Sequence, residues 1–155
     1  MSLHRLLLPA SAIAARRACA AVALLTVENG KRHCVTYSAV SVGDALKWAI
    51  KKLDNQKPDA AGLDTFLYWE TGNSGWREAD RWLRDKYSAV RNSVLSSNSA
   101  AGAMSVQGMA LAILLRKRWP QIALIETHPK VLYYALANRT YDFPSDMPAW
   151  LTLPQ

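Results

Sequence analysis

The chain has 155 residues, of which half are hydrophobic and a fifth are charged. This is the composition of a globular domain, and it excludes a disordered or fibrous chain. The formal net charge of +7 favours an acidic partner such as nucleic acid, although a solvated basic surface explains it about as well.

The two cysteines, Cys19 and Cys34, have no spacing that would indicate a zinc motif or a disulfide framework. Both are expected to be buried free thiols. Free thiols fit a reducing compartment, so we predict a cytoplasmic location. The long uncharged stretch at residues 92–115 contains too short an apolar part to span a bilayer, and no membrane association is expected.

In chain order, Asn29-Gly30 lies between apolar segments at residues 18–27 and 32–39 and predicts a hairpin. A targeting segment is the alternative for the basic and apolar N-terminus. Spacing predicts helices and two further strands (helices 45–53, 76–90, 101–119 and 129–138; strands 60–64 and 122–126). This order predicts one α/β domain over residues 1–155 with a mixed sheet, in which residues 1–17 are open to disorder and residues 139–155 form an irregular tail.

The helix predicted at residues 76–90 is amphipathic. Its apolar stripe should bury four side chains: Trp76, Ala79, Leu83 and Tyr87. The polar segment from Ser93 to Ser99 should then be a loop before the next helix.

Two apolar runs each end on a lone carboxylate. Ala60-Ala61-Gly62-Leu63 is followed by Asp64, and Ile122-Ala123-Leu124-Ile125 is followed by Glu126. Such runs suit buried parallel strands, whose carboxyl ends are the usual location of ligand sites. If the strands are neighbours, the two acids could share a hard ion such as Mg²⁺. Alternatively, each acid caps a turn or pairs with an arginine.

Three segments in this order resemble a family of predicted ribonuclease H-like nucleases catalogued as a domain of unknown function. They are Gly62-Leu63-Asp64 with the aromatic stretch through Trp69; Arg77, Asp80 and Arg84 with Ser97-Asn98-Ser99 and Val106-Gln107-Gly108; and Ile125-Glu126-Thr127-His128-Pro129-Lys130. The resemblance covers residues 60–138.

The resemblance implies a ribonuclease H-like mixed sheet flanked by helices and metal-dependent cleavage of nucleic-acid phosphodiesters. Asp64 and Glu126 match its acidic positions and would be catalytic metal ligands for Mg²⁺ or Mn²⁺. His128 would be an auxiliary catalytic group that orients a phosphate or assists proton transfer. Its alternative role is that of an ordinary helix-start side chain.

The chain departs from the family pattern at both ends. The family has an aspartate on its first strand, whereas residues 1–27 contain no acidic residue. Family members also continue into an acidic helix beyond the position of Gln155. These departures fit a chain that is truncated at both ends or a degenerate member of the family.

Arg77, Arg81 and Arg84 fall at i, i+4 and i+7, so a helix would place them on one face that could follow a phosphate backbone. Salt bridges with Asp80 and Asp85 are the ordinary alternative. Asn98 is a further candidate contact to nucleic acid, with a turn or cap role as its alternative.

The sequence therefore predicts a metal-dependent nuclease-like domain. Two alternatives stay open: a non-catalytic ribonuclease H-like domain that binds nucleic acid or a protein partner, and an incomplete gene product of marginal stability. The oligomeric state is not predicted.

Overall fold

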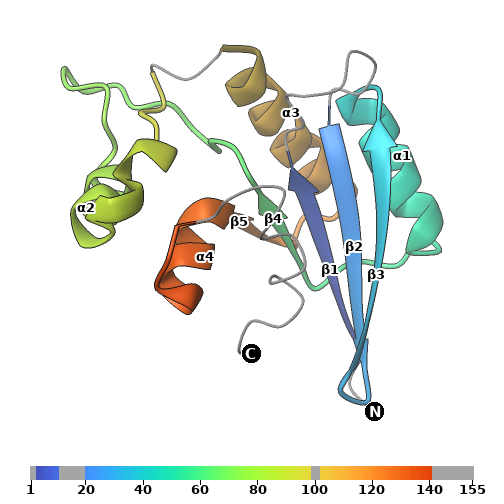
Figure 1. The fold of residues 1–155 in the computed structure, drawn as a ribbon. Helices are drawn as coiled ribbons and strands as arrows, with labels where there is room; N and C mark the ends of the chain where they lie inside the picture. Colours follow the sequence, from blue (N-terminus) through green and yellow to red (C-terminus); the bar gives the residue numbers. More distant parts are fainter. Residues whose placement is uncertain (1–2, 11–19, 99–101, 141–155) are drawn as a thin grey trace. The chain divides into compact units, whose positions relative to one another are not determined.

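The computed structural model describes residues 3–10, 20–98 and 102–140, which are coloured by position in Figure 1. Their contacts form two compact units. Unit 1 contains the described residues of 1–68 and 101–127, and unit 2 contains those of 69–100 and 128–155. Each unit has a hydrophobic core of its own.

Unit 1 contains a five-stranded sheet in the order β3-β2-β1-β4-β5 (Figure 1). Strand β2 is antiparallel to both of its neighbours, whereas β1, β4 and β5 pair in parallel. The strands are β1 (Leu3–Ala10), β2 (Ala20–Glu28), β3 (Lys31–Ala39), β4 (Ala60–Leu63) and β5 (Ala123–Glu126). The predicted α/β class with a mixed sheet is confirmed.

A two-residue turn joins β2 to β3. Asn29 has φ 51° and Gly30 has φ 76°, which is the conformation of the tight hairpin turn that Asn-Gly favours. The predicted hairpin is therefore confirmed.

Strand β1 lies inside the segment 1–17 that the sequence left open to disorder. It pairs with β2 from Leu3 opposite Glu28 to Ala10 opposite Ala21, so the long ladder orders these eight residues. Residues 11–19, which include Cys19, and most of the predicted tail at 139–155 lie outside the described residues.

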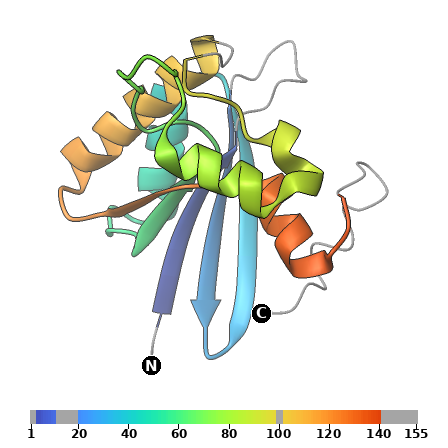
Figure 2. The same cartoon turned by 90° about the vertical axis from the view of Figure 1, so that its left-hand side faces the viewer.

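Helices α1 (Val42–Lys52) and α3 (Gly102–Arg118) cover the same face of this sheet (Figure 2). Helix α1 begins at Ser41, whose side chain accepts a hydrogen bond of 3.0 Å from the Asp44 amide. On the inner side of α3, Leu111 and Leu115 are buried one turn apart, and Pro120 lies just past its end. The core of unit 1 lies between the two helices and the sheet.

The start of α1 is also tied to β3 by Tyr37. Its hydroxyl donates a 3.0 Å hydrogen bond to Asp44 Oδ2, and its ring stacks on Trp48 at 5.5 Å. The hydrogen bond to the Asp44 carboxylate, followed by desolvation and the nearby negative charge, raises the pKa of Tyr37 above its ordinary value of 10.0.

We expect Asp44→Asn to bring the pKa of Tyr37 back toward that ordinary value. The measurement is the tyrosinate absorbance of each protein against pH, with a Tyr37→Phe titration subtracted from it. Because the pKa is raised on folding, this contribution to stability is complete below the unfolded pKa and is lost as pH rises through the folded pKa. An unchanged Tyr37 titration in Asp44→Asn would contradict the assignment.

Unit 2 contains α2 (Glu78–Lys86), the short 3-10 helix η1 (Ser88–Ser93) and α4 (Pro129–Ala137). Its core consists of Val90, Val94 and Val131, with Leu83, Tyr87 and Tyr134 packed against them. The helix predicted at 76–90 is therefore shorter than expected, because η1 continues the chain with a tighter turn after Tyr87.

The predicted buried stripe of α2 is wrong at Ala79, which is exposed, while Trp76, Leu83 and Tyr87 are half-buried. Arg77 is extended and precedes the helix instead of belonging to it. Between residues 76 and 87, the buried side chains are instead Arg77 and Asp80, whose opposite charges neutralise each other.

Cys34 was predicted to be buried but is an exposed free thiol. It lies on β3, the outermost strand of the sheet order, where most side chains are exposed. Among the residues that the structure describes, no helix has both the length and the apolar character needed to cross a bilayer.

Candidate metal-binding site

Strands β4 and β5 are parallel neighbours, which is the condition under which Asp64 and Glu126 could share an ion. Leu63 lies opposite Glu126 in the register, and the Thr127 amide donates a 2.8 Å hydrogen bond to the Leu63 carbonyl oxygen. Asp64 is the first residue after β4, and Glu126 is the last residue of β5. The two predicted metal ligands therefore belong to the same carboxyl edge of the sheet.

The loop after β4 returns to Glu126. The Leu67 amide donates a hydrogen bond of 3.1 Å to Glu126 Oε2, which fixes one carboxylate oxygen. The Glu126 side chain is half-buried, whereas its neighbour Ile125 is 55% exposed. This difference agrees with the alternation of side chains along a strand.

The same loop approaches α3 very closely at Gly108. A Cβ atom built on Gly108 would lie 1.9 Å from Thr65 Cγ2, so no larger residue fits without movement. Thr65 follows Asp64 directly. Gly108, in the second of the resembling segments, thus has a packing role beside the predicted site.

In unit 2, Arg77 and Asp80 form a buried bidentate ion pair. Arg77 Nε donates to Asp80 Oδ2 at 2.8 Å and Arg77 Nη2 donates to Asp80 Oδ1 at 2.6 Å. The two residues are only 3% and 1% exposed. Asp80 lies in the first turn of α2, where the helix dipole favours a carboxylate.

His128 precedes α4, also in unit 2. Its side chain does not cap the helix, although its carbonyl oxygen accepts a 2.9 Å hydrogen bond from the Leu132 amide. Pro129 occupies the first turn, where it has no amide hydrogen to leave unpaired. The half-buried His128 imidazole is thus not used to cap the helix.

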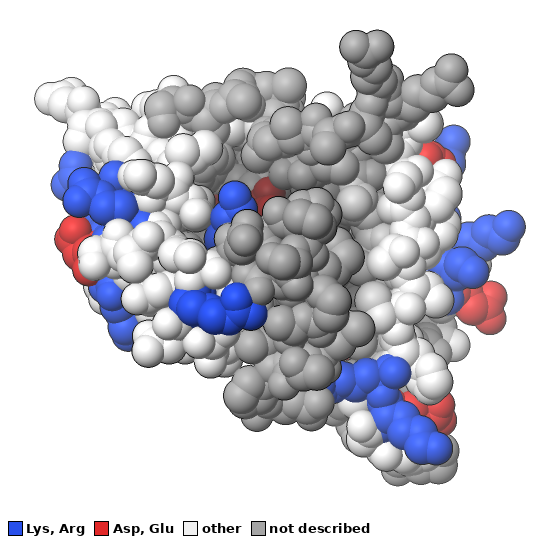
Figure 3. All heavy atoms as spheres, viewed as in Figure 1, with Lys and Arg blue, Asp and Glu red and all other residues white. Residues whose placement is uncertain are grey.

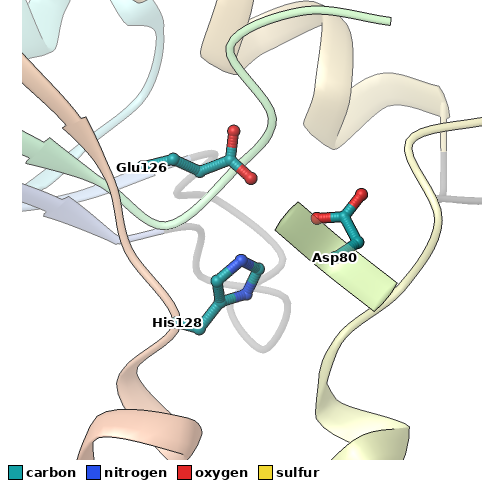
Figure 4. Close-up of side chains that lie close together, drawn as sticks. All are labelled: Asp80, Glu126 and His128. Atoms are coloured by element: carbon teal, nitrogen blue, oxygen red, sulfur yellow. The ribbon is translucent and has the colours of Figure 1, made fainter. Parts of the chain in front are cut away.

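The potential metal ligands labelled in Figure 4 come from both units. Glu126 belongs to unit 1, whereas Asp80 and His128 belong to unit 2. Glu126 and His128 are neighbours in the sequence, because only Thr127 separates them.

Within unit 1, the two strand-end acids Asp64 and Glu126 are the candidate ligands for a divalent ion, because Mg²⁺ binds through one or two carboxylates and keeps several waters. Asp80 was not among the predicted ligands. The signal for its burial was the opposite charges of Arg77 and Asp80, three residues apart within the second resembling segment.

The three arginines predicted to share a face do not do so. Arg77 precedes α2 and is buried against Asp80, while Arg84 donates to the carbonyl oxygens of Arg91 at 2.7 Å and Val94 at 2.8 Å. Only Arg81 is exposed. The spacing gave a wrong prediction because the helix begins after Arg77 and because Arg84 binds backbone carbonyl oxygens of η1 and of the residue after it.

Asn98 closes a loop within unit 2. Its side-chain amide donates a 2.9 Å hydrogen bond to the Glu70 carbonyl oxygen, while Ser97 Oγ accepts from the Glu70 amide at 3.1 Å. This arrangement is the turn-stabilising alternative considered for Asn98. In Figure 3 the described Lys and Arg side chains lie in separate small groups, several with an acidic side chain beside them.

No protein-family model matches the sequence, and no curated protein shows significant similarity to it. The resemblance to predicted nucleases therefore stays a prediction.

Proposed function

We propose that this protein is a divalent-metal-dependent, ribonuclease H-like domain that cleaves nucleic-acid phosphodiesters. The observation that carries the proposal is the pair of acids at one edge of the sheet. Asp64 directly follows β4, Glu126 ends β5, and these two strands are parallel neighbours.

The sheet supports the same proposal. The resemblance implies a mixed sheet flanked by helices, and the mixed five-stranded sheet of unit 1 with α1 and α3 on one face fits this expectation. Fold likeness alone does not specify chemistry, so the acids at the sheet edge carry the proposal.

Asp64 and Glu126 would hold Mg²⁺ or Mn²⁺, with His128 as the predicted auxiliary group and Asp80, an acid of the second resembling segment, as a further candidate. A bound ion would activate a water molecule and stabilise the leaving oxygen of a phosphodiester. The protein supplies the orientation: the Leu67 amide holds Glu126, and the Arg77 guanidinium holds Asp80.

The same two contacts support a second candidate function. Because Asp80 is paired with Arg77 and Glu126 accepts a hydrogen bond from the Leu67 amide, both acids have partners without a metal ion. A non-catalytic domain that binds nucleic acid or a protein is therefore the competing proposal.

Metal binding distinguishes these candidates. At an ion concentration of about 100 times Kd, an ion that binds only the folded protein stabilises it by about 2.7 kcal/mol. For a chain of this size that free energy corresponds to a rise in Tm of about 5–10 °C. We expect this rise in MnCl₂ relative to EDTA, measured by circular dichroism.

Glu126→Gln should remove most of the rise, and Glu78→Gln is the matched control because Glu78 is exposed on α2. A wild-type Tm that is indifferent to Mn²⁺ and Mg²⁺ would contradict the metal site. Cleavage is then assayed with labelled single- and double-stranded RNA and DNA, and Asp64→Asn should abolish it. Binding without ion-dependent cleavage would favour the second candidate.

A further inference from the structure

We propose that the protein forms a symmetric dimer in which β3 of one copy pairs antiparallel with β3 of a second copy. The pairing joins two unit 1 sheets into one continuous sheet, and its twofold axis passes beside Val35. The interface goes beyond the metal site and involves unit 1 alone, because β2, β3 and α1 all belong to it.

The dimer is inferred first from the long open edge of the sheet at β3 (Figure 1). Among the described residues, β3 pairs only with β2, and its nine residues match those of β2 one to one without a bulge. Sheet edges are ordinarily protected by short strands, charges, proline or bulges. The opposite edge, β5, has only four residues. By contrast, β3 contains no proline and carries its two charges, Lys31 and Arg32, in its first two positions.

The hairpin turn determines which backbone groups of β3 point away from β2. Residues that flank a two-residue turn exchange both of their hydrogen bonds, and such pairs alternate with non-hydrogen-bonded pairs along an antiparallel ladder. Lys31, opposite Glu28, is the first residue after the turn, so the odd-numbered residues of β3 bond to β2. The even-numbered residues therefore direct their amide and carbonyl groups to the open edge. They are Arg32, Cys34, Thr36 and Ser38.

Antiparallel pairing centred on Val35 matches these edge-facing groups with those of a second copy. In this register Cys34 lies opposite Thr36 of the second copy, and Arg32 lies opposite Ser38. Every edge-facing residue thus meets another one, and each such pair exchanges two backbone hydrogen bonds. A shift of one residue would instead place edge-facing groups opposite groups that already bond to β2.

The apolar side chain of Val35 favours the same register. Val35 lies two residues before Tyr37, whose ring stacks on Trp48 of α1, so Val35 belongs to the face that α1 covers. Its ladder partner on β2, Leu24, is 5% exposed, whereas Val35 at the edge is 44% exposed. In the dimer the two Val35 side chains lie directly opposite each other in a non-hydrogen-bonded pair, the closer of the two pair types. The pairing therefore extends the apolar core across the edge.

The charges of β3 are self-complementary in this register, which is why the proposed occupant of the edge is a second copy. Lys31 lies opposite Ala39 of the second copy, at the end of β3 that faces α1. There the Asp44 carboxylate accepts hydrogen bonds from the Val40 amide at 3.1 Å and the Tyr37 hydroxyl at 3.0 Å. The Lys31 ammonium of each copy thus approaches the Asp44 carboxylate of the other, and no like charges lie opposite each other along the strand.

The first test measures the mass of the full chain by sedimentation velocity over a range of protein concentrations. A reducing agent is present because Cys34 is an exposed thiol. We expect a reversible equilibrium of monomer and dimer. Val35→Lys places two like charges opposite each other at the axis and should raise the dimer Kd at least about tenfold. Ile113→Lys is the matched control, because Ile113 is an exposed apolar residue of α3 in the same unit, and it should leave the Kd unchanged.

Mixing two variants tests the symmetry of the interface. Val35→Glu should weaken self-association as Val35→Lys does. An equimolar mixture of the two should form a heterodimer, because opposite charges then face each other across the axis. We expect this mixture to associate at least about tenfold more tightly than either variant alone.

Amide hydrogen exchange of the wild-type protein, followed by nuclear magnetic resonance, requires no variant to fold. The edge-facing amides of Cys34 and Thr36 should exchange more slowly as the protein concentration rises. The amides of Val35 and Tyr37, which bond to β2, should be protected at every concentration.

A chain that stays monomeric at every concentration would overturn the proposal, as would a dimer whose Kd is unchanged by Val35→Lys. Protection of the Cys34 and Thr36 amides that does not depend on concentration would also overturn it, since another segment of the same chain would then cover the edge. Weak association of both variants without recovery on mixing would exclude an axis at Val35. None of these results bears on metal binding by Asp64 and Glu126.

Discussion

Replacement of Asp80 by alanine is expected to lower the free energy of unfolding by about 3–5 kcal/mol. Arg77 is 3% exposed and directs two donors at this carboxylate, so the variant would leave a buried positive charge without its counter-ion. The measurement is urea unfolding in EDTA, followed by circular dichroism, so that metal binding does not contribute.

Asp85→Ala is the matched control, because Asp85 lies on the same helix but is exposed. It should change stability by no more than about 0.5 kcal/mol. A double variant, Arg77→Met with Asp80→Leu, should be more stable than Asp80→Ala, since it removes both buried charges. Asp80→Ala with a stability within about 1 kcal/mol of wild type would show that the buried pair is not formed.

Gly108→Ala is expected to destabilise the protein by about 1–3 kcal/mol, the usual cost of overpacking. Alanine in a helix is ordinarily more stable than glycine by about 0.5–1 kcal/mol. Here the new methyl group would lie within 1.9–2.6 Å of three Thr65 side-chain atoms, so the loop after β4 or the helix must move. The same urea experiment measures the effect.

Gly43→Ala in α1 provides the opposite expectation. The nearest atom to its added Cβ is Ser41 Oγ at 3.8 Å, an ordinary contact, so the variant should gain about 0.5–1 kcal/mol. Thr65→Gly removes every side-chain atom that the Gly108→Ala methyl group would meet. A double-mutant cycle of these two changes should therefore give a favourable coupling of at least about 1 kcal/mol. Additive effects would argue against the close approach.

Gly108→Ala also tests how α3 supports the site. Thr65 lies between Asp64 and the segment whose Leu67 amide holds Glu126. If that loop shifts, the Mn²⁺-induced rise in Tm should be smaller in Gly108→Ala than in Gly43→Ala, even when both proteins are folded. An equal rise in the two variants would show that the loop keeps its position at the site.

Features that depend on neighbours in sequence were predicted well. The positive φ angles at Asn29 and Gly30 form the expected turn. Glu126 ends β5 as predicted, and β4 stops one residue before Asp64, because short apolar runs with an acid at the end indicate where a buried strand stops. The start of α4 at Pro129 was likewise apparent from the residue type.

Features that depend on distant contacts were predicted poorly. Arg77 and Asp80 were read as surface charges, but each is buried because the other neutralises it. Cys34 was expected to be buried, yet its strand lies at the outer end of the sheet order. An apolar or basic pattern along the chain does not specify which neighbours a strand or helix will have.

For this protein, the sequence alone determined the α/β class, the hairpin and the two strand-end acids, since local conformational preferences and hydrophobic patterning depend on residues a few positions apart. Only the tertiary structure decided that β4 and β5 are parallel neighbours and that Asp80 is buried against Arg77. The reason is that burying a charge is favourable only when a particular partner is present, and that partner is selected by the packing of the fold.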